Sequence, residues 1–98
     1  MITKEYILST MKSRKDEMCQ FGIKTIGLFG SYARNEQSEN SDIDILIDFE
    51  PEKENFDNYM AVYDIIEQLF KNQRVDIVTK NGLSPHIGPR ILNEVNYV

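Results

Sequence analysis

The sequence predicts an α/β (α+β) fold in which helices pack on a small mixed sheet of about three or more strands. Short apolar runs with strand-like alternation are separated by stretches with helical spacing, in the order helix, strand, short helix, strand, helix, strand, helix. A helix lies between the second and third predicted strands, and such a crossover favours a parallel pair. The first connection is too short for a full crossover helix, so we expect a mixed sheet rather than a purely parallel one.

Length and composition favour one domain over residues 1–98, located in the cytoplasm. The net charge of −5 and the scattered basic residues argue against stable nucleic-acid binding, which needs clustered Lys and Arg. The chain has one cysteine, Cys19, and one histidine, His86, which exclude a disulfide framework and a Cys/His zinc site. We expect Cys19 in the core and His86 on the surface. Neither a signal peptide nor an apolar run of the roughly 20 residues that span a membrane is visible.

The first third of the chain predicts a helix followed by a buried strand. Thr3 is a plausible N-cap for the helix, and Gly22 can end it. The apolar residues that recur at helical spacing are Ile7, Leu8, Met11 and Met18. Residues 24–29 form a short apolar run that is typical of a buried strand.

The next segment predicts a short helical turn with a loop over residues 32–40, and then a strand over residues 42–48. Alternation in this second strand divides its side chains between two faces of the sheet. One face carries Ile43, Ile45 and Ile47, and the other carries Asp42, Asp44, Leu46 and Asp48.

The second half predicts a long helix, a third strand and a final helix. The long helix is marked by Phe56, Tyr59, Met60, Tyr63, Ile66 and Phe70. Residues 74–79 form the third strand, and residues 80–82 form a turn. Ser84, which a proline follows, suggests the start of the last helix. Gly88, also followed by a proline, should kink or restart that helix.

Three aspartates are the candidate metal ligands. Asp42 and Asp44 stand at positions i and i+2 of a strand and therefore share a face, where they can converge on one hard cation. Asp76 lies within an apolar run of the third strand, and a buried carboxylate is costly unless it is paired or binds metal. A third carboxylate on a neighbouring strand allows two metal ions. The alternatives are a solvated sheet face for the first pair and an exposed strand position for Asp76.

A Gly30-Ser31 pair directly follows the first strand and is the candidate phosphate-binding turn. A glycine there allows a phosphate to approach the backbone, free N–H groups at a helical turn favour an anion, and the serine hydroxyl can donate once more. Taken alone, such a pair is a weak signal, because most such pairs are ordinary turns. No G-x-x-x-x-G-K-[ST] segment occurs, which excludes a P-loop.

Together these segments resemble a known family. Residues 30–34 (GSYAR), followed by residues 41–47 (SDIDILI), resemble the nucleotidyltransferase signature of the DNA polymerase β superfamily. The likeness is greatest to the minimal nucleotidyltransferases. Residues 75–79 resemble the strand that carries the third acidic residue in that family, and residues 90–98 resemble its C-terminal helix. The resemblance covers nearly the whole chain and implies the nucleotidyltransferase fold.

The resemblance implies a role for each motif residue. Gly30 and Ser31 would hold the β- and γ-phosphates of ATP. Asp42 and Asp44 would bind two Mg²⁺ ions. Asp76 would complete the second metal site and could accept the proton of the attacking hydroxyl.

Two further positions bear on the same turn. Arg34 matches a family position and either contacts phosphate or pins the loop. Asn35 stands where the family usually has glycine, and asparagine tolerates the left-handed conformation that such a turn needs.

The resemblance also implies a partner. Minimal nucleotidyltransferases are typically encoded beside a HEPN-domain ribonuclease toxin, so it implies an antitoxin that adenylylates a tyrosine of that toxin with ATP. Two other functions remain open, namely neutralisation by binding and occlusion without catalysis, and nucleotidyl transfer to a small molecule. Tyr59, Tyr63 and Tyr97 are either partner contacts or ordinary core and surface residues.

Overall fold

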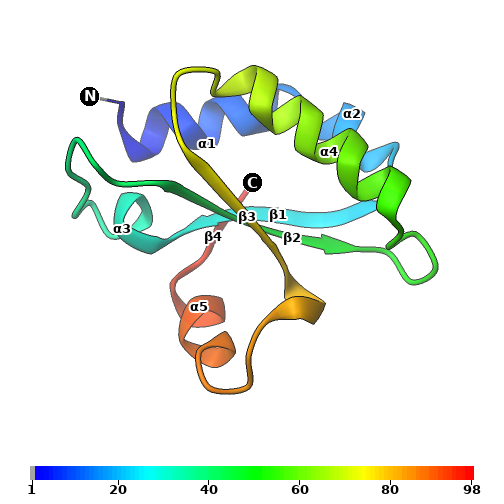
Figure 1. The fold of residues 1–98 in the computed structure, drawn as a ribbon. Helices are drawn as coiled ribbons and strands as arrows, with labels where there is room; N and C mark the ends of the chain where they lie inside the picture. The colour runs from blue at the N-terminus through cyan, green and yellow to red at the C-terminus, as the bar shows by residue number, and fades with distance from the viewer. Residues whose placement is uncertain (1) are drawn as a thin grey trace.

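The computed structural model describes residues 2–98, and its helices and strands follow the predicted order (Figure 1). The first half contains α1 (Lys4–Ser13), α2 (Lys15–Cys19), β1 (Ile23–Phe29), α3 (Gly30–Ala33) and β2 (Ile43–Phe49). The second half contains α4 (Phe56–Leu69), β3 (Val75–Thr79), the 3₁₀ turn η1 (Lys80–Gly82), α5 (Gly88–Glu94) and β4 (Asn96–Tyr97).

The four strands form one mixed sheet in the order β3-β2-β1-β4. Strands β2 and β3 are parallel, as the crossover helix between them predicts, and β1 is antiparallel to both of its neighbours. The prediction of a mixed sheet is therefore confirmed. The parallel pair matters for function because it aligns two candidate metal ligands.

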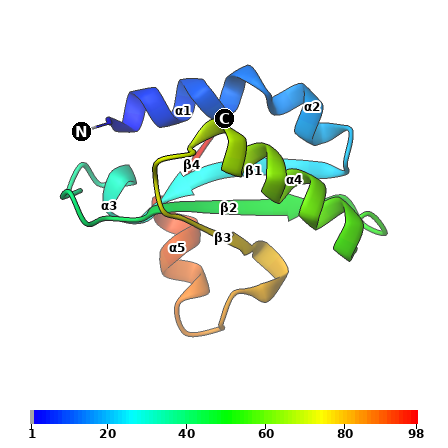
Figure 2. The ribbon, with the colours of Figure 1, turned by 45° about the horizontal axis from the view of Figure 1, so that its top comes forward.

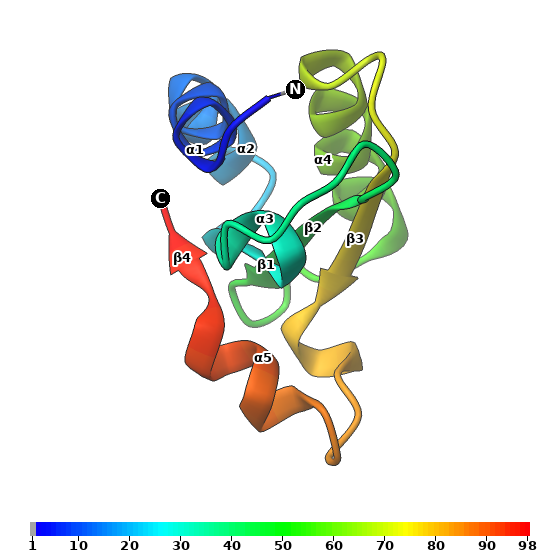
Figure 3. The same ribbon diagram turned by 90° about the vertical axis from the view of Figure 1, so that its left-hand side faces the viewer.

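Helices cover the sheet on both faces. Helices α1, α2 and α4 lie over one face, with α1 and α2 beside α4, whereas α5 lies on the opposite side (Figures 2 and 3). The main core fills the space between the three-helix layer and the sheet. Its fully buried side chains are Ile7, Met11, Met18, Ile26, Leu28, Ile43, Ile45, Ile47, Val62 and Ile66.

The edge strand β4 is the element that the sequence did not predict. It pairs with β1 beside Gly27, where a side chain would collide with the chain's own C-terminal segment. A Cβ atom on Gly27 would lie 2.6 Å from Cγ2 of Val95 and 2.9 Å from the carbonyl oxygen of Asn96. The missing side chain therefore lets the C-terminal segment approach β1 closely enough to pair with it as a fourth strand.

The N-terminal helix begins as predicted and ends earlier. The Thr3 hydroxyl accepts a hydrogen bond from the backbone N–H of Tyr6 at 3.1 Å, which confirms Thr3 as the N-cap. The helix breaks at Arg14 into α1 and α2. Gly22 follows in a left-handed conformation, with φ of +94°, and closes this segment before β1.

The predicted core position of Cys19 is wrong, and one residue that marked the apolar face of the long helix is exposed. Cys19 is exposed, because Met18 is the residue of the five-residue helix α2 that points into the core. Phe56 is 76% exposed at the start of α4. It lies six residues before the buried Val62, and at about 100° per residue this places it about 120° away from the buried face.

The predicted start of the last helix at Ser84 is also wrong. The hydroxyl of Ser84 accepts the N–H of the exposed His86 at 3.1 Å, and its carbonyl accepts the N–H of Gly88 at 2.8 Å. Ser84 therefore caps a single turn, and α5 starts afresh at Gly88, with Pro89 in its first turn. The predicted restart at Gly88 is confirmed, as is the surface position of His86.

The longest helix, α4, has 14 residues, which corresponds to about 21 Å of rise. Across residues 2–98 no helix combines the length and the apolar character needed to traverse a lipid bilayer.

Candidate active site

The register of the sheet brings two of the predicted aspartates together. Asp44 of β2 is the direct partner of Asp76 in the parallel β3, so both carboxylates leave the same face of the sheet. Asp44 is also the partner of Phe29, the last residue of β1. Gly30 therefore begins α3 immediately beside Asp44, whose partner Asp76 lies on the next strand, so the predicted phosphate turn adjoins this pair of predicted metal ligands.

The first residue of that turn is held from two sides. Gly30 adopts a left-handed conformation with φ of +78°, which favours glycine. The Asp44 carboxylate lies against its Cα, in the space that any side chain would need. The backbone N–H of Gly30 donates to Oε2 of Glu94 at 2.7 Å. In this conformation the Gly30 N–H is therefore not free to donate to a phosphate, as the prediction required.

The neighbouring Ser31 stands half-buried at the start of α3, and its carbonyl oxygen accepts the backbone N–H of Glu36 at 2.9 Å. This hydrogen bond closes the loop over Asn35, whose φ of +58° confirms the expected left-handed conformation. The turn therefore keeps its shape although asparagine stands where glycine is usual in the resembled family.

The electrostatics of Asp44 indicate a site suited to a cation. Partial burial, together with the negative charges of Asp76 and Asp42, raises the pKa of Asp44 to about 6. The positive charge of Arg34 acts in the opposite direction, and Glu94 adds to the repulsion. A bound cation would relieve this crowding of carboxylates.

Asp42 has a different partner in this conformation. Its side chain is exposed and pairs with Arg74, with 2.9 Å between Oδ1 and Nε. Arg74 also donates to the carbonyl oxygen of Asn40, at the end of the preceding loop. Within residues 2–98, no three His, Cys, Asp or Glu side chains already converge as a ligand set. Convergence of the three aspartates requires Asp42 to leave Arg74.

The expectation that Asp76 is buried is wrong. Asp76 is exposed because β3 is an edge strand, and only Val75 and Ile77 on its other face pack against the core. Asp76 nevertheless lies opposite Asp44 on the neighbouring strand, where a third metal-binding carboxylate was predicted. The donor set of three carboxylates is the kind of oxygen-rich set that suits Mg²⁺.

Arg34 is anchored by two glutamates. Its Nε donates to Oε1 of Glu36 at 2.9 Å, and its Nη1 donates to both carboxylate oxygens of Glu94 at 3.0 and 3.1 Å. These hydrogen bonds, first to Glu36 and then to Glu94, raise the pKa of Arg34. Of the two predicted roles, this conformation agrees with pinning the loop.

Glu94 is the residue of the site that the sequence did not reveal. It lies 64 residues after Gly30 and 60 after Arg34, so no local spacing connects it to them. The available signal was the one acidic residue of α5, at the end of that helix.

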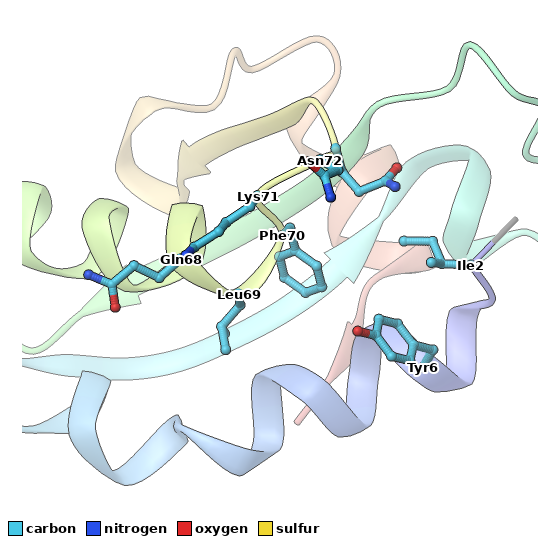
Figure 4. A pocket seen from close by; sticks show the side chains of 8 residues that line it. Ile2, Tyr6, Gln68, Leu69, Phe70, Lys71 and Asn72 are labelled. Atoms are coloured by element: carbon cyan, nitrogen blue, oxygen red, sulfur yellow. The ribbon is translucent and has the colours of Figure 1, made fainter.

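The site lies on the face of the sheet that the three-helix layer leaves uncovered. A cavity of about 320 Å³ lies instead between the start of α1 and the end of α4, lined by Ile2, Tyr6, Phe70 and their neighbours (Figure 4). Neither this cavity nor two others, one beside Asp48 and one beside Tyr97, includes Gly30 or any of the three aspartates.

Comparison with known proteins decides the family. The family model described as nucleotidyltransferase domain matches residues 11–98. The chain belongs to the nucleotidyltransferase family. Among relatives of this nucleotidyltransferase is the protein adenylyltransferase MntA of Thermococcus cleftensis, which is 41% identical over 99 residues, covering 100% of this chain and 98% of the relative.

Solved structures give the same answer for the fold. A minimal nucleotidyltransferase superposes with a TM-score of 0.81 at 28% identity, covering 97% of this chain and 95% of that one. A toxin–antitoxin structure with AMP-PNP superposes with a TM-score of 0.63 at 22% identity, covering 98% of this chain and 72% of that one. The chain is thus a minimal nucleotidyltransferase, as its motifs indicate.

Proposed function

We propose that this nucleotidyltransferase moves AMP from ATP onto a hydroxyl group of a partner protein. The partner we propose is a HEPN-domain ribonuclease toxin, with one of its tyrosines as acceptor. In this proposal the chain is an antitoxin that acts by adenylylation.

The observation that carries the proposal is the pairing of Asp44 with Asp76 beside Gly30. Two carboxylates from parallel strands and a phosphate-binding turn are the parts that a nucleotidyl transfer needs, because they can neutralise and align a triphosphate. The crowding that raises the pKa of Asp44 supports a cation at this place.

The three aspartates Asp42, Asp44 and Asp76 would hold Mg²⁺, which when bound neutralises the triphosphate and favours ionisation of the attacking hydroxyl. Ser31 and the backbone of the turn that Gly30 begins would orient the β- and γ-phosphates. Asp42 would exchange Arg74 for the metal.

The transfer itself balances without a further reactant. The acceptor oxygen forms a bond to the α-phosphorus while the bond from that phosphorus to the bridging oxygen breaks, and pyrophosphate leaves. The acceptor's proton passes to Asp76, whose exposed carboxylate is open to an incoming side chain. The acceptor therefore becomes a phosphodiester of AMP.

The relatives support the choice of acceptor and nucleotide. The Thermococcus cleftensis relative, which aligns along the whole chain, is named as a protein adenylyltransferase. The toxin–antitoxin structure that shares the fold was solved with AMP-PNP, an ATP analogue. The open face around Asp76 also suits a protein acceptor, since a side chain on a large partner can reach it.

The experiment is incubation of the purified chain with Mg²⁺, ATP and its co-encoded neighbour, followed by intact mass spectrometry of both proteins. We expect the neighbour to gain one or more AMP groups. The Asp42→Asn/Asp44→Asn double variant should remain folded and transfer nothing. Asp48→Asn is the matched control, because Asp48 lies on the same face of β2 but outside the site.

The other outcomes point to the alternatives. Neutralisation of the toxin by the double variant would replace adenylylation with occlusion by binding. No mass gain on either protein, alongside a stable complex between them, would leave occlusion by binding or transfer to a small molecule. Equal activity in the double variant and the Asp48→Asn control would remove the aspartates from the mechanism.

A further inference from the structure

The side chain of Glu94 joins two parts of the nucleotide-binding turn to the C-terminal helix. One of its oxygens accepts a hydrogen bond from the backbone N–H of Gly30 at 2.7 Å, and both oxygens accept hydrogen bonds from Nη1 of Arg34 at 3.0 and 3.1 Å. The Glu94 side chain is only 20% exposed, and its hydrogen bond with Gly30 is partly buried, whereas those with Arg34 are exposed. Charge-assisted hydrogen bonds of this kind are stronger than neutral ones and fix geometry.

The contact is long-range, whereas the other partner of Arg34 is local. Glu36 follows Arg34 by two residues in the same loop, and its side chain is 66% exposed. Glu36 therefore cannot tie the loop to another element. Glu94 ends α5, which lies across the opposite face of the sheet from the three-helix layer, so it links α3 to a separate part of the fold (Figure 3).

The position of Gly30 makes this link consequential. Asp44 lies against the Cα of Gly30, and Glu94 holds the N–H of the same residue. A shift of the turn would therefore change both the phosphate-facing backbone and the space available to a metal-binding carboxylate. Small displacements of such groups reduce nucleotide binding and turnover strongly.

We propose that Glu94 is a positioning residue for nucleotidyl transfer, which holds the Gly30 turn and Arg34 in the arrangement that binds the triphosphate. The inference rests on the proposed function for its substrate, ATP. Glu94 touches neither ATP nor the acceptor in this assignment, and it acts through the two groups that it binds.

The test compares Glu94→Ala and Glu94→Gln with the wild type. Glutamine keeps an acceptor for the Gly30 N–H but removes the charge that pairs with Arg34, whereas alanine removes both. We expect the Kd and KM for ATP with Mg²⁺ to rise about tenfold in Glu94→Ala and by an intermediate factor in Glu94→Gln, while kcat changes by less. The matched control Glu36→Gln also removes a partner of Arg34 and should change either constant less than about twofold.

Equilibrium binding of ATP with Mg²⁺ to the purified full chain needs no acceptor, so it separates this inference from the proposed function. If ATP binding weakens in Glu94→Ala but the wild type transfers no AMP, the role of Glu94 in positioning the ATP site is supported and the proposed transfer reaction is rejected. If a folded Glu94→Ala variant binds ATP and transfers AMP normally, only the proposed positioning role of Glu94 is rejected. Tighter ATP binding in Glu94→Gln would show that Glu94 competes with the triphosphate. A loss of ATP affinity in Glu36→Gln as large as in the Glu94 variants would show a general charge effect. Either result overturns the proposal. Absence of ATP binding by the wild type overturns both.

Discussion

The carboxylate of Asp44 occupies the space directly over the Cα of Gly30, so the phosphate-binding turn and a proposed metal ligand are in contact before any substrate arrives. The contact exists because β1 and β2 pair antiparallel with Phe29 opposite Asp44, and the glycine follows at once. Each residue thus depends on the other: the turn needs glycine, and the carboxylate needs the room that glycine leaves.

Gly30→Ala tests this dependence. The added methyl group meets the Asp44 carboxylate, and φ of +78° is strained for alanine, so we expect a loss of about 2 kcal/mol in the free energy of unfolding and loss of nucleotide binding. Urea denaturation and ATP titration measure the two effects. Asn35→Gly, at a second left-handed position of the same loop, should change the free energy of unfolding by less than about 1 kcal/mol. Equal effects of the two variants would contradict the proposed clash.

The pH dependence of stability follows from the raised pKa of Asp44. A carboxyl group whose pKa is about 6 when folded and about 3.9 when unfolded binds its proton more tightly in the folded state. Its stabilising contribution is therefore complete below about pH 4 and is lost as the pH rises through about 6. In EDTA, we expect Asp44→Asn to be more stable than the wild type at pH 7.5 by about 1 kcal/mol, since solvent screening reduces the full value of about 3 kcal/mol.

Urea titrations between pH 4 and 8 measure this difference, which should vanish near pH 4. Asp48→Asn is the matched control, because it removes a carboxylate from the same strand and face. The explanation is wrong if both variants differ from the wild type by the same amount at every pH.

Magnesium should stabilise the folded chain. A cation that binds among Asp42, Asp44 and Asp76 relieves the repulsion between them and does not bind the unfolded chain as well. At a Mg²⁺ concentration about tenfold above its Kd, we expect a gain of about 1.4 kcal/mol, which raises the Tm by about 5 °C or more. Differential scanning fluorimetry at constant ionic strength measures the shift. A shift of the same size in Asp44→Asn would place the ion elsewhere.

Arg74 should compete with the metal for Asp42. Its guanidinium is exposed, so Arg74→Gln should change the free energy of unfolding by less than about 1 kcal/mol. The same variant should lower the Mg²⁺ concentration for half-maximal stabilisation by about two- to threefold, because Asp42 no longer needs to leave a partner. Arg14→Gln, which breaks an exposed ion pair with Glu17 far along the chain, is the control. A weaker response to Mg²⁺ in Arg74→Gln would indicate that Arg74 orients Asp42 for the metal.

The residue pattern predicted the parts of the fold that local periodicity controls. The alternation of isoleucine and aspartate in β2 is so regular that it identifies both faces, and the helix between β2 and β3 determines their parallel pairing. These two features are enough to predict that Asp44 and Asp76 lie close together, without knowledge of the rest of the chain.

The remaining errors have long-range causes. The exposure of Asp76 depends on β3 being the edge strand, and the two-residue β4 depends on the bare Cα of Gly27. The exposure of Phe56 depends on which side of α4 faces the sheet, because Phe56 lies about 120° around the helix from the buried Val62. Glu94 joins the site only because α5 folds back across the sheet, and no spacing along the chain announces such a return.

The pairing of β1 limits how the length of the chain can change during evolution. Strand β1 is bonded to β2 on one side and to β4 on the other, and Gly30 follows its last residue directly. Deletion of one residue within the regularly paired residues 25–29 would turn the apolar side chains to the opposite face and would also withdraw Gly30 from Asp44. The loop between β2 and α4 carries no such constraint, because its residues 51–55 are exposed and lie outside the site. Insertions and deletions among relatives should therefore accumulate in that loop and avoid β1.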